Sequence, residues 1–115
     1  MLYKQKDIVM VPFLFTDAST EKKRPVLIIS NDHINRDYQN GDFVGIAITT
    51  TVRQTPYTVQ IDKSNLESGD LPQQSLIQCS KFATILKSKV IKRLGTIDDK
   101  TFSAVKANVL AVIKN

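Results

Sequence analysis

Cysteine and histidine are almost absent from this chain, and their scarcity removes several kinds of chemistry. The 115 residues contain one cysteine, Cys79, and one histidine, His33. A lone cysteine cannot form an internal disulfide, and without a Cys or His companion at ligand spacing it is a poor start for a metal site. A nuclease mechanism that divides acid and base roles between two histidines is excluded within one chain. We therefore expect no metal and no cofactor, and we interpret Cys79 as a buried, inert thiol.

Glycine-rich loops and long apolar segments are missing as well. The four glycines form no phosphate-cradling loop, and there is no G-x-S-x-G nucleophile elbow. No apolar run approaches the roughly 20 residues of a membrane-spanning helix, and the N-terminal residues lack an apolar segment of signal-peptide length. Without a phosphate-cradling loop or a nucleophile elbow, nucleotide-driven and α/β-hydrolase chemistry are excluded. The expectation is a cytoplasmic protein with no membrane partner.

A moderate excess of positive charge is present instead. Lysine and arginine number 16 against 11 aspartates and glutamates, which gives a net charge of +5 at pH 7. This balance favours polyanionic partners. The length suffices for one domain with its own core and is short for two, so residues 1–115 are predicted to form a single domain.

Short apolar stretches between turn-forming segments predict a mainly β (α+β) fold. Predicted strands cover residues 7–15, 25–30, 43–50, 57–61 and 74–79, and the ambiguous residues 82–94 favour strand. Predicted loops cover residues 16–23, 31–42, with room for one helical turn, and 62–73. After Asp98, the residues Phe102, Val105, Val109 and Val112 or Ile113 recur at helical steps, which predicts one amphipathic C-terminal helix. Gly45 marks a bulge or a close backbone approach. Together these elements predict a small, partly open antiparallel β-barrel with a C-terminal α-helix.

A basic triplet and a proline precede one apolar strand. Lys22, Lys23, Arg24 and Pro25 lead into V-L-I-I-S, so a charged guanidinium stands where a rigid strand can aim it at a phosphate. RNA carries its own nucleophile, the 2'-OH, so a protein need only orient it, stabilise charge and assist proton transfer. The threonines at positions 49–51 could supply hydroxyls for this. Residue types alone leave a surface cation and ordinary strand-forming threonines as alternatives.

The order of whole segments resembles the MazF/PemK family, the toxin components of prokaryotic toxin-antitoxin pairs. D-I-V-M-V-P-F-L-F-T-D (residues 7–17) and K-K-R-P-V-L-I-I-S-N-D (22–32) are similar to the opening of the family. V-G-I-A-I-T-T (44–50) looks like its third strand, and L-P-Q-Q-S-L-I-Q-C (71–79) and K-R-L-G-T-I (92–97) match later segments. The resemblance therefore covers nearly the whole chain in order.

This resemblance implies an SH3-like barrel of the CcdB/MazF kind that forms a homodimer and binds single-stranded RNA in the interface groove. It implies metal-independent, sequence-selective endoribonuclease cleavage by 2'-OH attack, which leaves a 2',3'-cyclic phosphate and a 5'-OH. By position, Arg24 matches the catalytic arginine of the family's second strand, and Thr49 matches the hydroxyl residue of its third. Arg24 would stabilise the phosphorane, and Thr49 would hydrogen-bond the scissile phosphate. A cognate antitoxin, acidic and disordered, would bind the same groove.

The expected RNA-binding residues include two positions where the chain departs from some members of the family. Those members carry R-C-D on the fifth strand, and this chain has Gln78, Cys79 and Ser80 there. Gln78 and Ser80 can hydrogen-bond RNA but cannot replace a cation or a carboxylate. The full set of expected RNA-binding residues is Lys22, Lys23, Thr50, Gln78, Ser80 and Lys81. The missing charges motivate an alternative, a catalytically attenuated module of the same fold that binds RNA or an antitoxin. A CcdB-like gyrase-binding toxin is a further alternative, against which the Arg-Pro strand argues.

Several other residues have two readings. One group of cations forms either a solvated strand face or a rim that binds successive phosphates: Lys87, Lys89, Lys92 and Arg93. His33 is either a solvated loop residue or a substrate contact. The candidates for stacking on bases are Phe13, Phe15, Tyr38 and Tyr57. Lys6 stands where the family usually has glycine, and we expect it to alter only the turn that enters the first strand.

Overall fold

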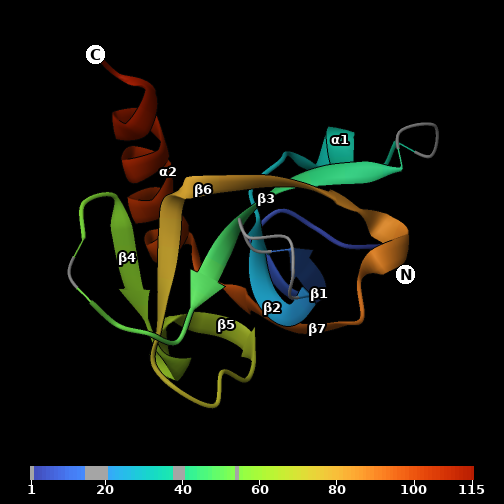
Figure 1. The fold of residues 1–115 in the computed structure, drawn as a ribbon, viewed down its shortest axis with the longest axis horizontal. Helices are drawn as coiled ribbons and strands as arrows, with labels where there is room; N and C mark the ends of the chain where they lie inside the picture. The colour runs from blue at the N-terminus through green and yellow to red at the C-terminus, as the bar shows by residue number, and fades with distance from the viewer. Residues whose placement is uncertain (1, 15–20, 38–40, 54) are drawn as a thin grey trace.

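A seven-stranded antiparallel sheet forms the body of the protein. The computed structural model describes residues 2–14, 21–37, 41–53 and 55–115. The strands, in the order β4-β6-β3-β2-β1-β7-β5 across the sheet, are β1 (Asp7–Leu14), β2 (Glu21–Ile28), β3 (Asp42–Thr49), β4 (Thr58–Ile61), β5 (Leu66–Gly69), β6 (Ser75–Leu86) and β7 (Lys92–Ile97). The helices are α1 (Asp32–Asn35) and α2 (Asp99–Ile113), with short 3₁₀ helices η1 (Lys63–Asn65) and η2 (Lys87–Lys89). Figure 1 shows the long strand β6 bending, so that the sheet curls into a half-barrel with α2 beside it. The predicted fold class is confirmed.

Alternation along the strands divides the apolar side chains between two cores. Ile8, Leu27 and Ile46 form one row across β1, β2 and β3 and belong to the core that includes residues of α2. The next row contains Val9 and Val26, which face the other side of the sheet and belong to a second core with residues of β3 and β6. Both faces of the central strands are therefore buried over much of their length.

The C-terminal helix begins as predicted and leaves the core before it ends. Asp98 is the N-cap, and its carboxylate accepts a hydrogen bond of 2.7 Å from the backbone N–H of Thr101. Phe102 and Val105 are buried and Val109 packs against the same core, whereas Ile113 is 73% exposed, so the apolar stripe leaves the core in the last turn of the helix. No helix in the described part of the chain is long and apolar enough to cross a bilayer.

The second strand starts earlier than its sequence suggests, which corrects the prediction of a loop over residues 16–23. β2 begins at Glu21, and Lys22 and Lys23 pair with Phe13 and Pro12 of β1. Their exposed, charged side chains resemble a loop in sequence, but the backbone ladder with β1 holds them in a strand. Residues 15–20 of the predicted loop lie outside the described residues.

The polar segment 62–73 is also not simply a loop, because it contains η1 and β5. β5 pairs with β7, where Gly69 has a φ of +89°. A Cβ on Gly69 would lie 2.3 Å from the Cα of Gly95, so two glycines let the backbones meet. The ambiguous segment 82–94 contains the end of β6, η2 and the start of β7. Gly45 proves to be a close approach, since a Cβ there would lie 2.3 Å from Cγ1 of Val26.

Candidate functional site

Neighbouring strands of the sheet bring Arg24 and Thr49 to the same face. In the ladder between β2 and β3, Val26 pairs with Ala47 and Ile28 pairs with Gly45. The pairing ends at Val26 and Ala47, and Arg24 and Thr49 lie two residues beyond it, on the same face as these two residues by alternation along each strand. On this face, β2 and β3 contribute Val26 and Phe43 to the second core. The apolar core thus gives way to a cation in the middle of β2 and a hydroxyl at the end of β3.

The same row of residues continues across β6 and β4. Thr49 pairs with Leu76 of β6, and Leu76 pairs with Gln60 of β4. Two residues along, Gln78 of β6 pairs with Thr58 of β4. Opposed residues of an antiparallel pair point to the same face, so all five side chains lie on the side of the sheet away from α2.

An open cleft of about 430 Å³ lies over this part of the sheet. Its hydroxyl groups come from Thr49, Thr51, Thr55, Thr58 and Ser80. Arg53 and Lys81 supply its cations, Gln78 supplies an amide, and Pro56 and Leu76 are apolar. A second cavity of about 490 Å³ shares Arg53 and Leu76 with it, so the two hollows adjoin along the β3–β4 connection. No aspartate or glutamate is among the described residues that line either cavity.

Hydrogen bonds fix the lip of the cleft. The Thr49 hydroxyl accepts a bond of 3.1 Å from the backbone N–H of Thr51, which leaves the hydroxyl hydrogen to be donated to another group. The Thr58 hydroxyl donates to the carbonyl of Thr55 at 2.8 Å. The backbone N–H of Cys79 donates to the carbonyl of Tyr57 at 2.9 Å. The β3–β4 connection is therefore tied to the sheet at both ends.

Cys79 lies between two cleft residues of β6 but takes no part in the cleft. Its side chain is fully buried in the core that faces α2, as predicted. Burial raises the pKa of the Cys79 thiol to about 11, so it stays protonated at neutral pH. Gln78 and Ser80 alternate with it and line the cleft on the opposite face.

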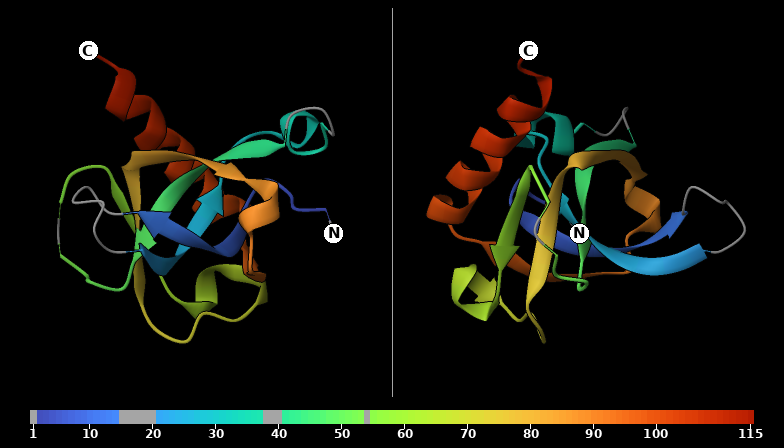
Figure 2. Two further views of the ribbon diagram at one scale, coloured as in Figure 1. Left: turned by 45° about the vertical axis from the view of Figure 1, so that its right-hand side comes forward. Right: turned by 60° about the vertical axis from the view of Figure 1, so that its left-hand side comes forward.

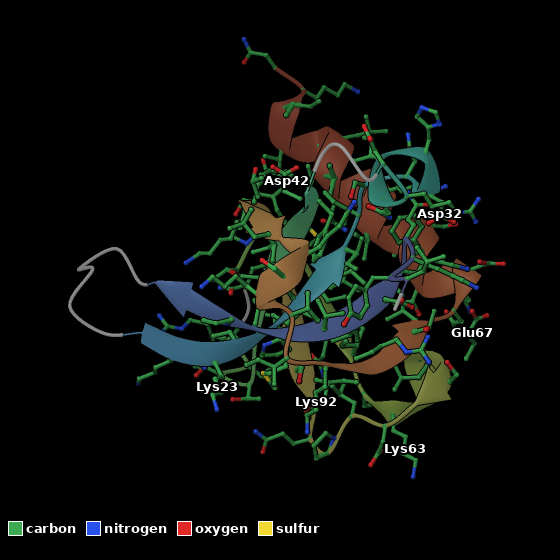
Figure 3. All side chains as sticks on the ribbon, turned by 90° about the vertical axis from the view of Figure 1, so that its right-hand side faces the viewer. Lys23, Asp32, Asp42, Lys63, Glu67 and Lys92 are labelled. Carbon is green, nitrogen blue, oxygen red and sulfur yellow. The ribbon has the colours of Figure 1, made fainter. Side chains whose placement is uncertain are left out.

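The structure gathers some of the expected site residues and separates others. Gln78, Ser80 and Lys81 line the cleft with Thr49. Thr50 is exposed in the bend that follows β3, and it is not among the described residues that line the cleft. Lys22 points to the same face of the sheet as Arg24. Lys23 points to the opposite face, as does Lys92 of β7. Met10 of β1 pairs with both Pro25 and Lys92, so Pro25 shares the face of Lys92, and Lys23, two residues before Pro25, shares it too. Figure 3 shows Lys23 and Lys92 extending from the same side of the sheet.

Residues that the sequence left with two readings lie away from the cleft. β1 and β2 separate β7 from β3, so Lys92 and Arg93 are across the sheet from it. Lys87 donates to the carbonyl of Asp37, and His33 is exposed on α1.

Of the aromatic candidates, Tyr57 stands beside the cleft residues Pro56 and Thr58. It is 44% exposed, with a φ of +64°. Phe15 and Tyr38 lie outside the described residues, as does the side chain of Phe13.

Sequence reasoning missed the contribution of the β3–β4 connection. Arg53, Thr55 and Thr58 line the cleft, yet none was singled out as a ligand contact. The available signal was the hydroxyl-rich run T-T-T-V-R-Q-T with one cation inside it. Among the residues that the structure describes, no three His, Cys, Asp or Glu side chains gather closely enough to hold a metal ion.

Comparisons with known proteins agree on one group. A family profile described as PemK-like, MazF-like toxin of type II toxin-antitoxin system matches residues 4–113. An endoribonuclease from a mycobacterial species is 19% identical, with a TM-score of 0.77 over 98% of this chain and 92% of that one.

Two further solved structures have the same fold. The Mycobacterium tuberculosis toxin MazF-mt6 is 24% identical, with a TM-score of 0.74 over 92% of this chain and 94% of that one. A MazE-MazF structure from Deinococcus radiodurans is 14% identical, with a TM-score of 0.75 over 98% and 96%. No curated protein sequence matched the chain.

Proposed function

Because the chain belongs to the PemK-like, MazF-like toxins of type II toxin-antitoxin systems, we propose that it is an endoribonuclease that cleaves single-stranded RNA in the cytoplasm. Cleavage is sequence-selective and requires no metal ion. Residues 1–115 act as a single domain that pairs into a homodimer. A cognate antitoxin restrains the enzyme by occupying the RNA groove, as expected of a partner for a toxin of this class.

The observation that carries this proposal is the shared face of Arg24 and Thr49 beside a cleft rich in donors. The strand that carries Arg24, β2, pairs with the strand that carries Thr49, β3. The cleft that begins at Thr49 has hydroxyls, an amide and two cations but no carboxylate among its described lining residues. Such a lining suits a chain of phosphates, because every charged group in it attracts an anion.

In the proposed reaction, the 2'-oxygen attacks the adjacent phosphorus while the bond from phosphorus to the 5'-oxygen breaks. The 2'-OH loses a proton and the departing 5'-oxygen gains one, so the products are a 2',3'-cyclic phosphate and a 5'-OH. Arg24 stabilises the added negative charge of the phosphorane, and the Thr49 hydroxyl donates to a nonbridging oxygen. A guanidinium holds its proton tightly, so its role is electrostatic.

Purified protein, a long single-stranded RNA and EDTA test the proposal. We expect wild type to cut the RNA at a limited set of sites and Arg24→Ala to lose at least about a hundredfold in rate, since electrostatic stabilisation of this kind is worth about that much. Arg36→Ala is the matched control, because Arg36 is an exposed arginine at the C-cap of α1. Absence of cleavage by wild type, or equal cleavage by Arg24→Ala, would contradict the proposal.

Gln78 and Ser80 favour one other function, an attenuated module that binds RNA or an antitoxin without cutting. Both side chains line the cleft and both are uncharged. Binding of the RNA with no cleaved product in the same assay would select this alternative. Inhibition of DNA supercoiling with intact RNA would select a gyrase-binding toxin.

A further inference from the structure

We propose that Arg53, on the connection between β3 and β4, is a second RNA-phosphate contact of the active site, beside the single cation, Lys81, that β6 contributes to the cleft. This inference rests on the proposed function and names a residue that the motif resemblance does not reach. It assigns to Arg53 the phosphate next to the scissile one, where the RNA chain passes from Thr49 into the cleft.

Position is the first support for this role. Arg53 lines both cavities, which adjoin along the β3–β4 connection. Thr49 lines the cleft of about 430 Å³, and the second cavity extends past Gln60. An RNA strand that places one phosphate at Thr49 and continues along the trough passes Arg53. Figure 1 and the left view of Figure 2 show the connection at the margin of the molecule beside β4, away from α1.

The charge inventory of the cleft is the second support. On β6, Gln78 and Ser80 line the cleft without a charge, and Lys81 is the one β6 cation among the described lining residues. Arg53 and Lys81 are the only cations among the described residues that line it. A guanidinium can bind a phosphate through two parallel N–H groups, whereas an ammonium acts as a point charge. Arg53 is therefore the better fixed phosphate contact of the two.

The anchoring of the connection is the third support. Two residues before Arg53, the N–H of Thr51 donates to the Thr49 hydroxyl. Two residues after it, the carbonyl of Thr55 accepts from the Thr58 hydroxyl. Both anchors end on residues that line the cleft, so the backbone that carries Arg53 is held against the site. Thr49 thereby has a second use, since its hydroxyl oxygen holds the connection while its hydrogen faces the phosphate.

The dependence of cleavage on salt tests this inference. The quantity measured is kcat/KM for a single-stranded RNA in EDTA between about 50 and 300 mM NaCl, for wild type, Arg53→Ala and Arg53→Lys. A lost phosphate contact flattens the plot of log kcat/KM against log salt by about 0.7 for a single strand. We expect Arg53→Ala to lower kcat/KM about tenfold at the lowest salt and to flatten the slope. Arg53→Lys should keep the slope and recover part of the rate.

Two controls keep the result interpretable. Arg36→Ala removes an arginine from an exposed site on α1 and should change neither rate nor slope. Arg53 is itself exposed, so its removal should leave the urea unfolding midpoint unchanged.

The possible failures are distinguishable. A wild-type rate and slope for Arg53→Ala would overturn the inference and leave the proposed function intact, provided that Arg24→Ala is inactive. A loss of rate with an unchanged slope would also overturn it, because the contact would then not be to a phosphate. An inactive wild type, or an active Arg24→Ala variant, would instead remove the proposed function on which the inference rests.

Discussion

Two polar regions of this sheet use similar side chains for different purposes. Around β5, β7 and the start of α2, each acid has a partner within the protein. Lys6 hydrogen-bonds Asp99, and this bond raises the pKa of Lys6. The Lys6 Nζ also lies 4.0 Å from Oε1 of Glu67. Buried Asp7 accepts from the Thr96 hydroxyl at 2.8 Å and from the N–H of Lys4 at 2.9 Å. The cleft over β3, β4 and β6 has cations and hydroxyls but no acid among its described lining residues.

The difference separates polar groups that hold the fold from polar groups that receive a ligand. An acid with donors on both oxygens stabilises the folded state, and losing it leaves buried donors without acceptors. Cations that line a hollow without an acid raise the local positive potential, which attracts an anion. Substitutions in the first region should therefore change stability with little effect on catalysis, and substitutions in the second should do the reverse.

The largest stability effect is expected at Asp7. Asp7→Ala should lower the free energy of unfolding by about 2–3 kcal/mol, because the buried hydroxyl of Thr96 and the partly buried N–H of Lys4 both lose their acceptor. Urea denaturation measures this, with Asp70→Ala as the matched control. Asp70 is exposed and lies 3.9 Å from Lys63, so its loss should cost at most about 0.5 kcal/mol. If the two variants were equally stable, or if folded Asp7→Ala lost its RNA cleavage, the division between the regions would fail.

Thr49 gives the converse test on the cleft side. Thr49→Val removes the hydroxyl that accepts from Thr51 and that we expect to donate to the phosphate. We expect kcat/KM for RNA to fall about tenfold or more with unfolding nearly unchanged, and Thr49→Ser to retain most of the activity. The control is Thr84→Val, because Thr84 is an exposed threonine on the part of β6 that pairs with the start of β3. Equal activities for Thr49→Val and wild type would contradict a role for the hydroxyl.

Lys6 tests whether a non-glycine residue at this position lowers the stability of the fold. Its φ of +81° is in the left-handed region that favours glycine. Lys6→Gly and Lys6→Ala both remove the ammonium, so they differ mainly in this backbone term. We expect Lys6→Gly to unfold with a free energy about 1 kcal/mol higher than that of Lys6→Ala. The reverse order in urea denaturation would show that the turn imposes no such cost, and cleavage should be the same in both variants.

The smallest expected effect is the pH dependence that Asp98 contributes. Hydrogen bonds from the side chain and backbone of Thr101 lower the pKa of the Asp98 carboxyl. A carboxyl whose folded pKa is lowered stabilises the fold above its unfolded pKa, and this contribution is lost as the pH falls below about 4. Asp98→Asn keeps an N-cap acceptor but cannot titrate. The stability difference between wild type and Asp98→Asn should therefore favour wild type more at pH 7 than at pH 3, and a constant difference would contradict the assignment.

Much of the fold could be predicted from local pattern, because apolar runs mark β1 and β3, apolar alternation marks β4, and helical spacing marks α2. The start of β2 and all of β5 could not. Lys22 and Lys23 are exposed residues held by backbone pairing, and β5 depends on the contact of Gly69 with Gly95. Neither feature has an apolar signature.

Part of the candidate site could also be predicted from the sequence, and part could not. Arg24 and Thr49 were found through resemblance to a family, since residues so far apart in sequence reveal no shared face by spacing. The β2–β3 register supplies that relation. Arg53 was missed because its relevance depends on where a connecting segment lies, which the sequence alone does not specify.

Mapping the ends of cleaved RNA in the presence of EDTA tests the central claim most directly. If the cleft that begins at Thr49 serves a metal-independent attack by the 2'-OH, wild type should produce 2',3'-cyclic phosphate and 5'-OH ends, and Arg24→Ala should produce neither. Products with 3'-OH and 5'-phosphate ends, or cleavage that stops when EDTA is added, would contradict the account.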